Sequence, residues 1–394
     1  MASHHRFDDI TVSDLVAQGS MKWTRNPGHL SAFVAEMDFG TAPVITEALH
    51  AAIDKAQMGY LPPGVKSDMA EATSDYLSSH YGWAIPAEQI YPTADVLSAF
   101  DLVLARFSTP GSAVILPTPA YMPFLTIAPA RGHQVIQVPM IAGPSGRAEM
   151  DLEAIGRAFE AGAEVFILCN PHNPLGRVYS QEELEALAVV VEAHGGLVFS
   201  DEIHAPLTLE GHRHIPYASL SEATANHTLT ATSASKAFNI PGLKCAQLIV
   251  SSAAHQESLR EVAFMVSHGS ATPGVMANTV AYRAGGPWLA DVLGYLDTNR
   301  TLLGELLATH IPAMGYTPPE GTYIAWIDAN GLPDIKGDRS WAQFFADEAQ
   351  VGLTDGALCG EAGVGHLRLM LATPGHILEK IILAMAEALK AHSA

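Results

Sequence analysis

A lysine at the end of an apolar run is the residue of this chain whose position most suggests chemistry. Lys236 lies in the segment SASKAFNIPGLK, directly after the apolar run HTLTAT, and a second cation, Lys244, follows in the same segment. An amine among small residues, with another cation nearby, suits a Schiff base with an anionic, phosphorylated aldehyde. Most lysines on surface loops are only solvated charges, so this interpretation depends on partners elsewhere in the chain.

Two other segments contain side chains that such an aldehyde cofactor needs. Asp201, in FSDEIH, ends a buried run, where a carboxylate requires a cationic partner. It could face a protonated pyridine nitrogen, or it could be only a helix cap or an ion pair. Asn173 lies in the turn CNPHNPLGR, directly before a proline that restricts its backbone, and its amide could bind a phenolate oxygen. His204 is expected to pack or hydrogen-bond beside the same ring.

A phosphate group could be held where a loop enters a helix. The chain reads PTADVLSAF after Tyr91, and backbone N–H groups at a helix N-terminus bind phosphate without a glycine motif. The candidate residues for this phosphate site are Ala94, Asp95, Val96, Leu97, Ser233, Ser235 and Lys244. Asp95 could equally be a helix cap and nothing more.

An aromatic residue and a strand arginine complete the set. Tyr121, in PTPAYMPF, could stack on the cofactor ring, although a core tyrosine is an equal alternative. Arg368 lies within the strand-like run HLRLMLA, and a guanidinium among Leu and Met must find an anion. A substrate carboxylate is its preferred bidentate partner, and a structural pair with Asp or Glu is the alternative.

Short apolar runs that alternate with amphipathic ones predict the elements that position these residues. The strand-like runs span 113–117, 164–169, 196–202, 227–233 and 245–251, and helices are predicted over 96–107 and 181–194. The second helix starts with Ser180 and Glu183 in capping-box spacing. This α/β pattern predicts a mainly parallel sheet, of the seven-stranded type, with helices on both faces. Ligands of such sheets bind at the carboxyl ends of the strands, which is where the candidate residues fall.

The end of the chain predicts a second, smaller α/β domain. Strands are expected at 322–329 and 366–372, with helices near 340–349 and 375–391 and a long connecting helix around 274–309. The N-terminal segment is expected to complete this domain and to run across both. We therefore assign residues 46–285 to a large cofactor-binding domain, and residues 1–45 with 286–394 to a small domain.

The composition narrows the class of partner. A chain of 394 residues with 48% hydrophobic and 16% charged residues is typical of a compact globular protein. A formal charge of -20 argues against nucleic acid and anionic membranes as partners. Three well-separated cysteines predict buried free thiols and a cytoplasmic location, and no run predicts a signal peptide or a membrane span. We expect no bound metal.

With Asn173, Asp201, Ser233, Lys236, Lys244 and Arg368 in this order, the chain resembles the fold-type I pyridoxal-phosphate (PLP) enzymes, the aspartate aminotransferase superfamily, over nearly its whole length. Several segments are similar to the branch of cystathionine β-lyases and carbon–sulfur lyases of the MalY/PatB type: NPHNPLGR, SDEIH, SASKAFNIPGLK, VAEMDFGTAP, GYLPPG, TYIAWID and VGLTDGALCG.

The resemblance implies PLP as the cofactor and a role for each candidate residue. Lys236 would bind the aldehyde, Asp201 would pair with the pyridine nitrogen, and Asn173 would bind the ring oxygen O3′. Tyr121 would stack on the ring, so that Lys236, Asp201 and Tyr121 form the expected catalytic set. Arg368 would bind the α-carboxylate of the substrate, with Asn173 beside it. Tyr60 would reach the phosphate and substrate of a neighbouring subunit, which implies a homodimer with active sites at the subunit interface.

The implied reaction converts L-cystathionine or a related cysteine S-conjugate to a thiol, pyruvate and ammonia, within methionine and sulfur amino acid metabolism. An aminotransferase acting with a 2-oxo acid is the alternative, and a PLP-fold protein that regulates by protein contact is a third. Two residues depart from common family patterns. Many relatives carry arginine where Lys244 stands, which leaves the phosphate contact less fixed. Aminotransferases often have a tyrosine where His204 falls, and its absence favours the lyase.

Overall fold

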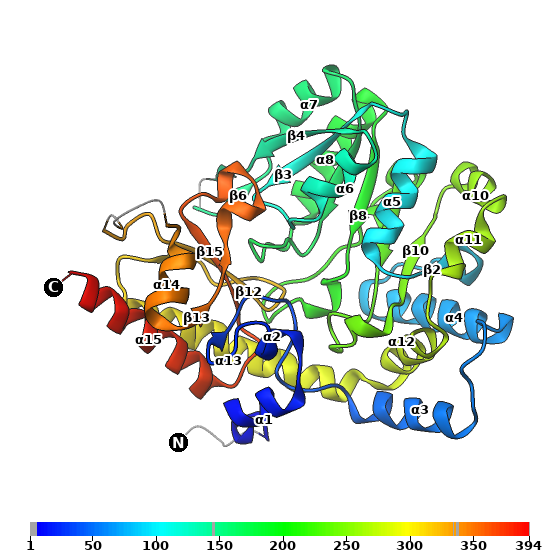
Figure 1. The fold of residues 1–394 in the computed structure, drawn as a ribbon. Helices are drawn as coiled ribbons and strands as arrows, with labels where there is room; N and C mark the ends of the chain where they lie inside the picture. Colours follow the sequence, from blue (N-terminus) through cyan, green and yellow to red (C-terminus); the bar gives the residue numbers. More distant parts are fainter. Residues whose placement is uncertain (1–5, 144–145, 334, 336–338, 394) are drawn as a thin grey trace.

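The centre of the fold is a mixed seven-stranded sheet. The computed structural model describes residues 6–143, 146–333, 335 and 339–393. The strand order is β2-β10-β9-β8-β7-β3-β4 (Figure 1). All neighbours in this sheet are parallel except β10, which runs antiparallel to β9 and β2. The strands are β2 Ile90–Thr93, β3 Ala113–Thr118, β4 Gln134–Pro139, β7 Ala163–Cys169, β8 Leu197–Asp201, β9 Thr228–Thr232 and β10 Ala246–Ile249.

The predicted α/β fold with a mainly parallel sheet is therefore confirmed. Each of the five apolar runs forms a strand of this sheet, whereas β2 and β4 had no assigned run. Both are edge strands whose sequences differ from a buried run: β2 contains Pro92, and β4 keeps most of its residues at least partly exposed. A pattern search for continuous apolar strands misses such edges.

Helices cover both faces of the sheet because successive strand residues point to opposite sides. Val114 and Leu116 of β3 pack with α5 (Val96–Phe107) and α6 (Phe124–Ala130). Their neighbours Ala113 and Ile115 pack with α7 (Leu152–Glu160) and α8 (Gln181–His194). The predicted capping box begins α8, since the Ser180 hydroxyl accepts the Glu183 N–H while the Glu183 carboxylate accepts the Ser180 N–H.

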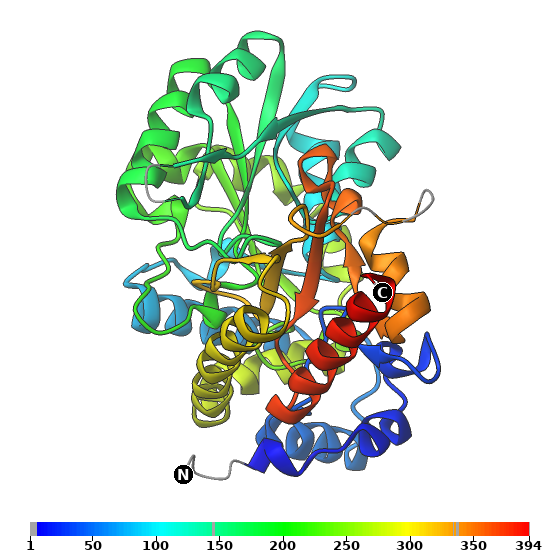
Figure 2. The same ribbon diagram turned by 90° about the vertical axis from the view of Figure 1, so that its left-hand side faces the viewer.

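A smaller antiparallel sheet, of order β11-β12-β15-β14, forms the second part of the molecule. Its strands are β11 Gly315–Tyr316, β12 Ile324–Asp328, β14 Thr354–Asp355 and β15 His366–Met370. Helices α13 (Gly286–His310) and α15 (Gly375–Ser393) lie side by side against it (Figure 2), with α14 (Trp341–Ala349) nearby. The N-terminal strand β1 (Leu30–Ser31) pairs with β13 (Val351–Gly352).

The long helix expected around 274–309 is two helices, so that expectation was wrong. Helix α12 (Thr272–Ala284) ends before Gly285, and α13 starts with proline in its first turn. Proline lacks the N–H that a continuous helix would need there and fits the start of a new one. The remaining helices are α1 Val12–Gln18, α2 Met21–Thr24, α3 Pro43–Asp54, α4 Pro63–Tyr81, α9 Glu222–Asn226, α10 Ala253–Arg260 and α11 Ala263–His268, and the hairpin strands are β5 Ile141–Ala142 and β6 Ala148–Glu149.

The N-terminal segment packs on both parts of the molecule. Phe7, Leu15 and Trp23 belong to one hydrophobic cluster together with Phe238 of the large part and Leu369 of the small sheet. The domain boundaries at 45/46 and 285/286 stay a prediction. Cys169, Cys245 and Cys359 are buried free thiols. In the described ranges, no helix combines the length and apolarity that crossing a membrane requires.

Candidate active site

Lys236 lies in the loop after β9 and faces the carboxyl edge of the large sheet. Its Nζ donates a 3.1 Å hydrogen bond to the Ala35 carbonyl of the N-terminal segment. The residue retains some accessible surface, yet its amine lies deep enough for desolvation to lower the pKa of Lys236 to about 8. The positive charge of Arg368 lowers it further, and the carboxylates of Glu36 and Asp201 oppose this. The amine of Lys236 therefore loses its proton more readily than that of a surface lysine, so it can act as a base or a nucleophile.

Asp201 ends β8 and is almost completely buried opposite Cys169 of β7. Its Oδ1 accepts the N–H of Ile203 at 3.1 Å. Burial raises the pKa of Asp201 to about 7, against the opposing effects of the Ile203 hydrogen bond and Lys236. A carboxyl group in this environment gains most from a cation placed directly against it.

Arg368 and Asn173 meet in the centre of the site. Arg368 is 3% exposed, and its guanidinium donates to neutral acceptors, namely Asn173 Oδ1 at 3.3 Å, the Phe33 carbonyl at 3.2 Å and Thr354 Oγ1 at 3.4 Å. Its Nε finds no hydrogen-bond partner in the described ranges. Burial lowers the pKa of Arg368. Since Oδ1 of Asn173 is engaged, its Nδ2 remains the group that can donate to a ligand.

His204 and Tyr121 lie beside these charges. His204 is buried, and its Nδ1 has no partner among the residues that the structure describes. Burial, followed by the charges of Lys236 and Arg368, lowers the pKa of His204 to about 3, so its imidazole is neutral. Tyr121 packs edge-on against Phe124 at 5.7 Å, and burial together with the Asp201 charge raises the pKa of its hydroxyl.

Two of the residues suggested for a phosphate group, Asp95 and Lys244, meet at the start of α5. Asp95 caps this helix by accepting the Ser98 N–H at 2.8 Å, and Lys244 Nζ lies 2.9 Å from Asp95 Oδ2. Desolvation raises the pKa of Asp95, but the hydrogen bonds from Lys244 and Ser98 outweigh this effect and hold the pKa below its usual value. Asp95 is thus a helix cap, and the N–H groups of Val96 and Leu97 start the helix beside it.

The Ser233 hydroxyl is already engaged in hydrogen bonds within the protein. The Ser233 hydroxyl donates to the Cys245 carbonyl at 2.7 Å and accepts the Ser235 N–H at 2.9 Å. It therefore holds the lysine loop against β10. Tyr60 lies outside this cluster: it is 92% exposed before α4, with its ring stacked 6.5 Å from that of His268.

Sequence reasoning missed the contribution of the N-terminal segment 33–37. The Ala35 carbonyl accepts hydrogen bonds from both Lys236 and Tyr323, the latter at 2.9 Å, and the Phe33 carbonyl accepts from Arg368. Backbone carbonyls carry no residue-type signal. The N-terminal segment was expected to run across both domains, and VAEMDFGTAP was noticed as a family-like motif, but no residue of 33–37 was assigned to the site. Tyr323 was noticed only as part of a strand.

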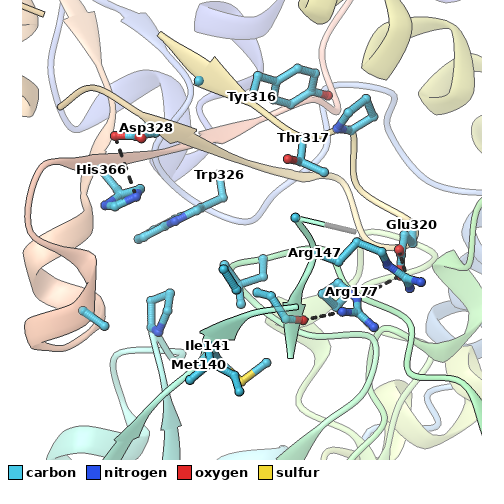
Figure 3. A pocket seen from close by; sticks show the side chains of 18 residues that line it. Met140, Ile141, Arg147, Arg177, Tyr316, Thr317, Glu320, Trp326, Asp328 and His366 are labelled. Carbon is cyan, nitrogen blue, oxygen red and sulfur yellow. Dashed lines mark hydrogen bonds and ion pairs between the residues drawn. The ribbon is translucent and has the colours of Figure 1, made fainter. Parts of the chain in front are cut away.

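A cavity of about 520 Å³ adjoins the site between the two parts of the molecule (Figure 3). The rings of Trp326 and His366 stack in its wall, 5.1 Å apart. Trp326 is the register partner of Arg368 and lies on the same face of the small sheet. Neither Lys236 nor Asp201 lines this cavity. The candidate site is therefore defined by the contacts around Lys236 and not by the cavity.

The fold, and the meeting of a lysine, a carboxyl group and an arginine at its carboxyl edge, match the fold-type I class that the sequence resembles. A family model described as "Aminotransferase class I and II" matches residues 34–380, and the chain belongs to this family.

Named relatives fall in the predicted branch. A Mycobacterium leprae protein provisionally named a cystathionine beta-lyase is 36% identical, over 97% of this chain and 98% of its own. "Cystathionine beta-lyase PatB" of Bacillus subtilis is 32% identical, over 89% and 91%. A crystal structure provisionally described as a PLP-dependent beta-cystathionase of Corynebacterium diphtheriae superposes with a TM-score of 0.91 at 36% identity, over 97% and 99%. The predicted resemblance to the MalY/PatB branch is confirmed.

Proposed function

We propose that this protein is a PLP-dependent carbon–sulfur β-lyase that cleaves L-cystathionine or related cysteine S-conjugates to a thiol, pyruvate and ammonia. Relatives named cystathionine beta-lyase, which are similar over nearly the full length of this chain, support the class of reaction. The observation that carries the proposal is a set of buried ionisable groups whose charges act on one another: Lys236, Asp201 and Arg368, each with a pKa displaced by burial.

The residues present fit PLP. A protonated pyridine nitrogen would supply the cation that the buried Asp201 carboxyl lacks. Asn173 Nδ2 and the neutral His204 would face the oxygen-bearing side of the ring, and Tyr121 its face. The phosphate would bind at the start of α5 with Lys244, helped by the helix N-terminus. When bound, PLP supplies an electron sink for the charge left on the substrate Cα.

The side chains of this chain would perform the remaining work. Lys236, with a pKa of about 8, would hold the cofactor and then remove the Cα proton onto its Nζ. Arg368 would bind the α-carboxylate through its fork, held in position by Asn173 and the Phe33 carbonyl. Asp201 would keep the pyridine nitrogen protonated. The Cβ–S bond then breaks with its electron pair on sulfur, and water converts the remaining fragment to pyruvate and ammonia.

The proposal includes a homodimer with shared sites. Tyr60 is almost fully exposed, and the apolar side chains of Met58, Phe264 and Met265 are also exposed. A second copy that covered this surface would bring Tyr60 to the partner site. We further propose a cytoplasmic enzyme of sulfur amino acid metabolism, with the large and small domains divided at residues 45/46 and 285/286.

The test is incubation of the purified protein with PLP and L-cystathionine in the absence of any 2-oxo acid. Pyruvate and thiol should form in equal amounts, and the Lys236→Ala variant should form neither. Conversion that requires a 2-oxo acid and releases no thiol would replace the lyase with an aminotransferase.

A further inference from the structure

Two motifs that lie far apart in the chain are joined at the candidate site. One is SASKAFNIPGLK, which contains Lys236 and, three residues later, Asn239. The other is VAEMDFGTAP, which contains Ala35, Met37 and Gly40. The Ala35 carbonyl of the second motif accepts the hydrogen bond from Lys236 Nζ at 3.1 Å. The place of this carbonyl therefore decides whether the amine has an acceptor.

The side-chain amide of Asn239 binds the second motif through three hydrogen bonds. Its Oδ1 accepts the Met37 N–H at 2.9 Å, and its Nδ2 donates to the Met37 carbonyl at 2.9 Å and to the Gly40 carbonyl at 3.0 Å. An aspartate of the same shape lacks both donors. Asn239 also has a φ of 56°, in the left-handed region that asparagine tolerates better than most residues. The type of this residue is therefore suited to the contact.

Other hydrogen bonds keep the same segment over the site. The Asp38 N–H donates to the Ala372 carbonyl, just after β15, at 2.9 Å. The Asp38 carboxylate accepts from Lys22 Nζ at 2.7 Å and from Trp23 Nε1 at 2.8 Å. These bonds tie the segment to β15 and to α2, whereas Asn239 ties it to the loop after β9. Removal of the Asn239 amide should therefore loosen the segment against that loop without uncovering the site.

The amine of Lys236 lies among several titratable and charged groups. Those that interact with its charge or share its acceptor are Glu36, Asp201, His204, Tyr323 and Arg368. Burial and Arg368 lower the pKa of Lys236, while the carboxylates of Glu36 and Asp201 raise it. A carbonyl acceptor also favours the ammonium form of an amine. Since Ala35 and Glu36 both belong to the segment that Asn239 binds, loosening it weakens two effects that keep the proton on the amine.

We propose that Asn239 is a positioning residue, which holds the Ala35 carbonyl within hydrogen-bonding distance of the Lys236 amine. During the reaction, this carbonyl would accept from the amine after it has taken up the substrate proton. That consequence rests on the proposed lyase function, whereas the contact itself is present in the protein without cofactor. If Asn239 served stability alone, its removal would lower the free energy of unfolding and leave the amine unchanged.

The test compares two asparagines whose amides donate to backbone carbonyls, in the cofactor-free protein. Asn239→Gly removes all three bonds of this side chain and suits a positive φ. Asn299→Ala is the matched control, because Asn299 Nδ2 donates to the Leu371 and Thr373 carbonyls at 2.8 and 2.7 Å, and its place in helix α13 suits alanine. Both variants should unfold at a lower urea concentration than the wild type.

Only Asn239→Gly should change the amine. Labelling with acetic anhydride from about pH 6 to 10, with mass spectrometry of the peptide that contains Lys236, measures the pKa of the amine. This pKa should be lower than in the wild type by about one pH unit, as expected for a weakened hydrogen bond to a charged group. Hydrogen exchange of residues 33–41 should be faster by about tenfold or more. Asn299→Ala should show neither change.

A pKa of Lys236 in Asn239→Gly that equals or exceeds the wild-type value would overturn the inference. Asn239→Ser, which lacks the amide donors but keeps a polar side chain, repeats the measurement with the same expected direction if Asn239→Gly does not fold.

Kinetics of the PLP-loaded protein separate failure of this inference from failure of the lyase proposal. With L-cystathionine, Asn239→Gly should lower kcat by about tenfold, leave KM within about twofold, and move the ascending limb of the kcat–pH profile to lower pH. If the wild type forms no pyruvate while the pKa of the amine still falls in Asn239→Gly, the lyase proposal is wrong and the positioning role stands. A wild-type kcat and pH profile in Asn239→Gly would overturn its role in the reaction.

Discussion

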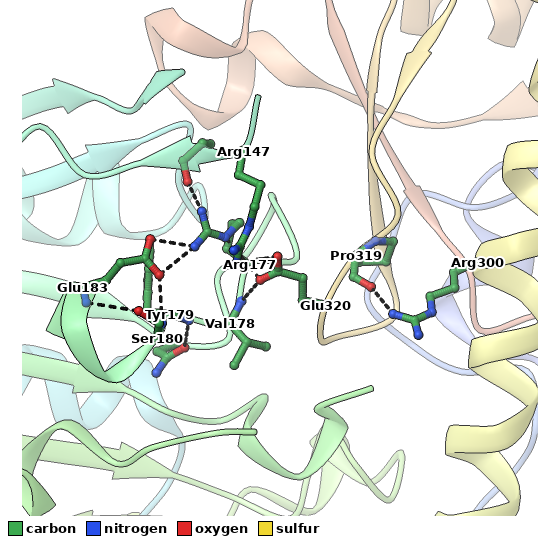
Figure 4. A network of polar contacts seen from close by, with 11 residues as sticks. Arg147, Arg177, Val178, Tyr179, Ser180, Glu183, Arg300, Pro319 and Glu320 are labelled. Carbon is green, nitrogen blue, oxygen red and sulfur yellow. Dashed lines mark hydrogen bonds and ion pairs between the residues drawn. The ribbon is translucent and has the colours of Figure 1, made fainter. Parts of the chain in front are cut away.

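Two arginines of this protein, Arg177 and Arg368, are similarly buried but differ in their partners. Arg177 belongs to a network between the two parts of the molecule (Figure 4). Its guanidinium binds Glu183 at 2.7 Å and Glu320 at 3.2 Å, and Arg147 binds the other oxygen of Glu320 at 2.6 Å. Arg368 instead meets an amide, a carbonyl and a hydroxyl.

The pKa values of the two arginines move in opposite directions for this reason. Although burial opposes it, the carboxylates of Glu183 and Glu320 raise the pKa of Arg177. Burial lowers the pKa of Arg368. Burial of a charge therefore does not by itself mark a functional site. A buried charge whose counterion is missing does, because a ligand must supply that counterion.

The largest effect is expected at Lys236, which lies near Arg368 among the buried charges that lack a full set of partners. Lys236→Ala should lower elimination by roughly 10³-fold or more, because the proposed base and the covalent link to PLP are both removed. The visible absorption band of the bound cofactor should change while the circular dichroism spectrum stays that of the wild type. Retained activity would contradict the role of Lys236.

Arg368→Ala should lower kcat/KM, mainly through a higher KM, because the substrate carboxylate loses its partner. The loss should correspond to about 2–5 kcal/mol of transition-state stabilisation. Arg368→Lys keeps the charge without the planar fork and should recover only part of the loss. Steady-state kinetics with L-cystathionine measure both. An unchanged KM in Arg368→Ala would exclude carboxylate binding there.

Substitutions in the network around Arg177 should change the stability of the protein rather than its catalysis. Glu320→Gln leaves two arginines short of a carboxylate and should lower the free energy of unfolding by about 2–4 kcal/mol. Urea unfolding measures this change, with Glu47→Gln as the surface control, and kcat should remain within a few-fold of wild type. A large loss of kcat with unchanged stability would remove the contrast between the regions.

Asp201 offers a pH-dependent test in the cofactor-free protein. Its pKa of about 7 in the folded state lies above the usual value of about 3.9, so the folded state binds more protons between these values. The free energy of unfolding contributed by this residue therefore falls as the pH rises from about 4 to 7. Asp201→Asn should be nearly neutral at pH 4 and stabilising by roughly 4 kcal/mol at pH 8, while weakening PLP binding. Urea unfolding at the two pH values checks this, and a stability difference independent of pH would contradict it.

The smallest effect is expected at Lys244. Its pair with Asp95 is exposed, so Lys244→Ala should weaken PLP binding by only about 0.2–1 kcal/mol. Lys244→Arg should bind PLP at least as tightly as wild type, because a guanidinium matches phosphate geometry. Equilibrium titration with PLP measures both, and a hundredfold loss in Lys244→Ala would show that the phosphate site depends on this lysine.

Much of the fold follows from local sequence signals. The five buried strands, the capped helix α8 and the exact span of α5 were predictable because apolar runs, caps and periodicity are local properties. The edge strands and the break at Gly285 were less accessible, because they depend on sheet position and on how a proline starts a new helix. The residues of the candidate site were named in advance for their chemical type, but not with the contacts that surround them.

The sequence by itself determined which side chains are available for chemistry and the ends of the strands from which they project. Only the tertiary structure decided which of them keep unused hydrogen bonds. Ser233 and Asp95 were candidates for the phosphate site, with a helix cap as the alternative for Asp95. In the structure the Ser233 hydroxyl holds a loop, and Asp95 caps a helix. Glu36 was not singled out, yet its Oε2 is buried without a hydrogen-bond partner among the described residues, and its charge raises the pKa of Lys236. The physical reason is that satisfaction of a polar group depends on neighbours distant in sequence, which only the folded chain brings within bonding distance.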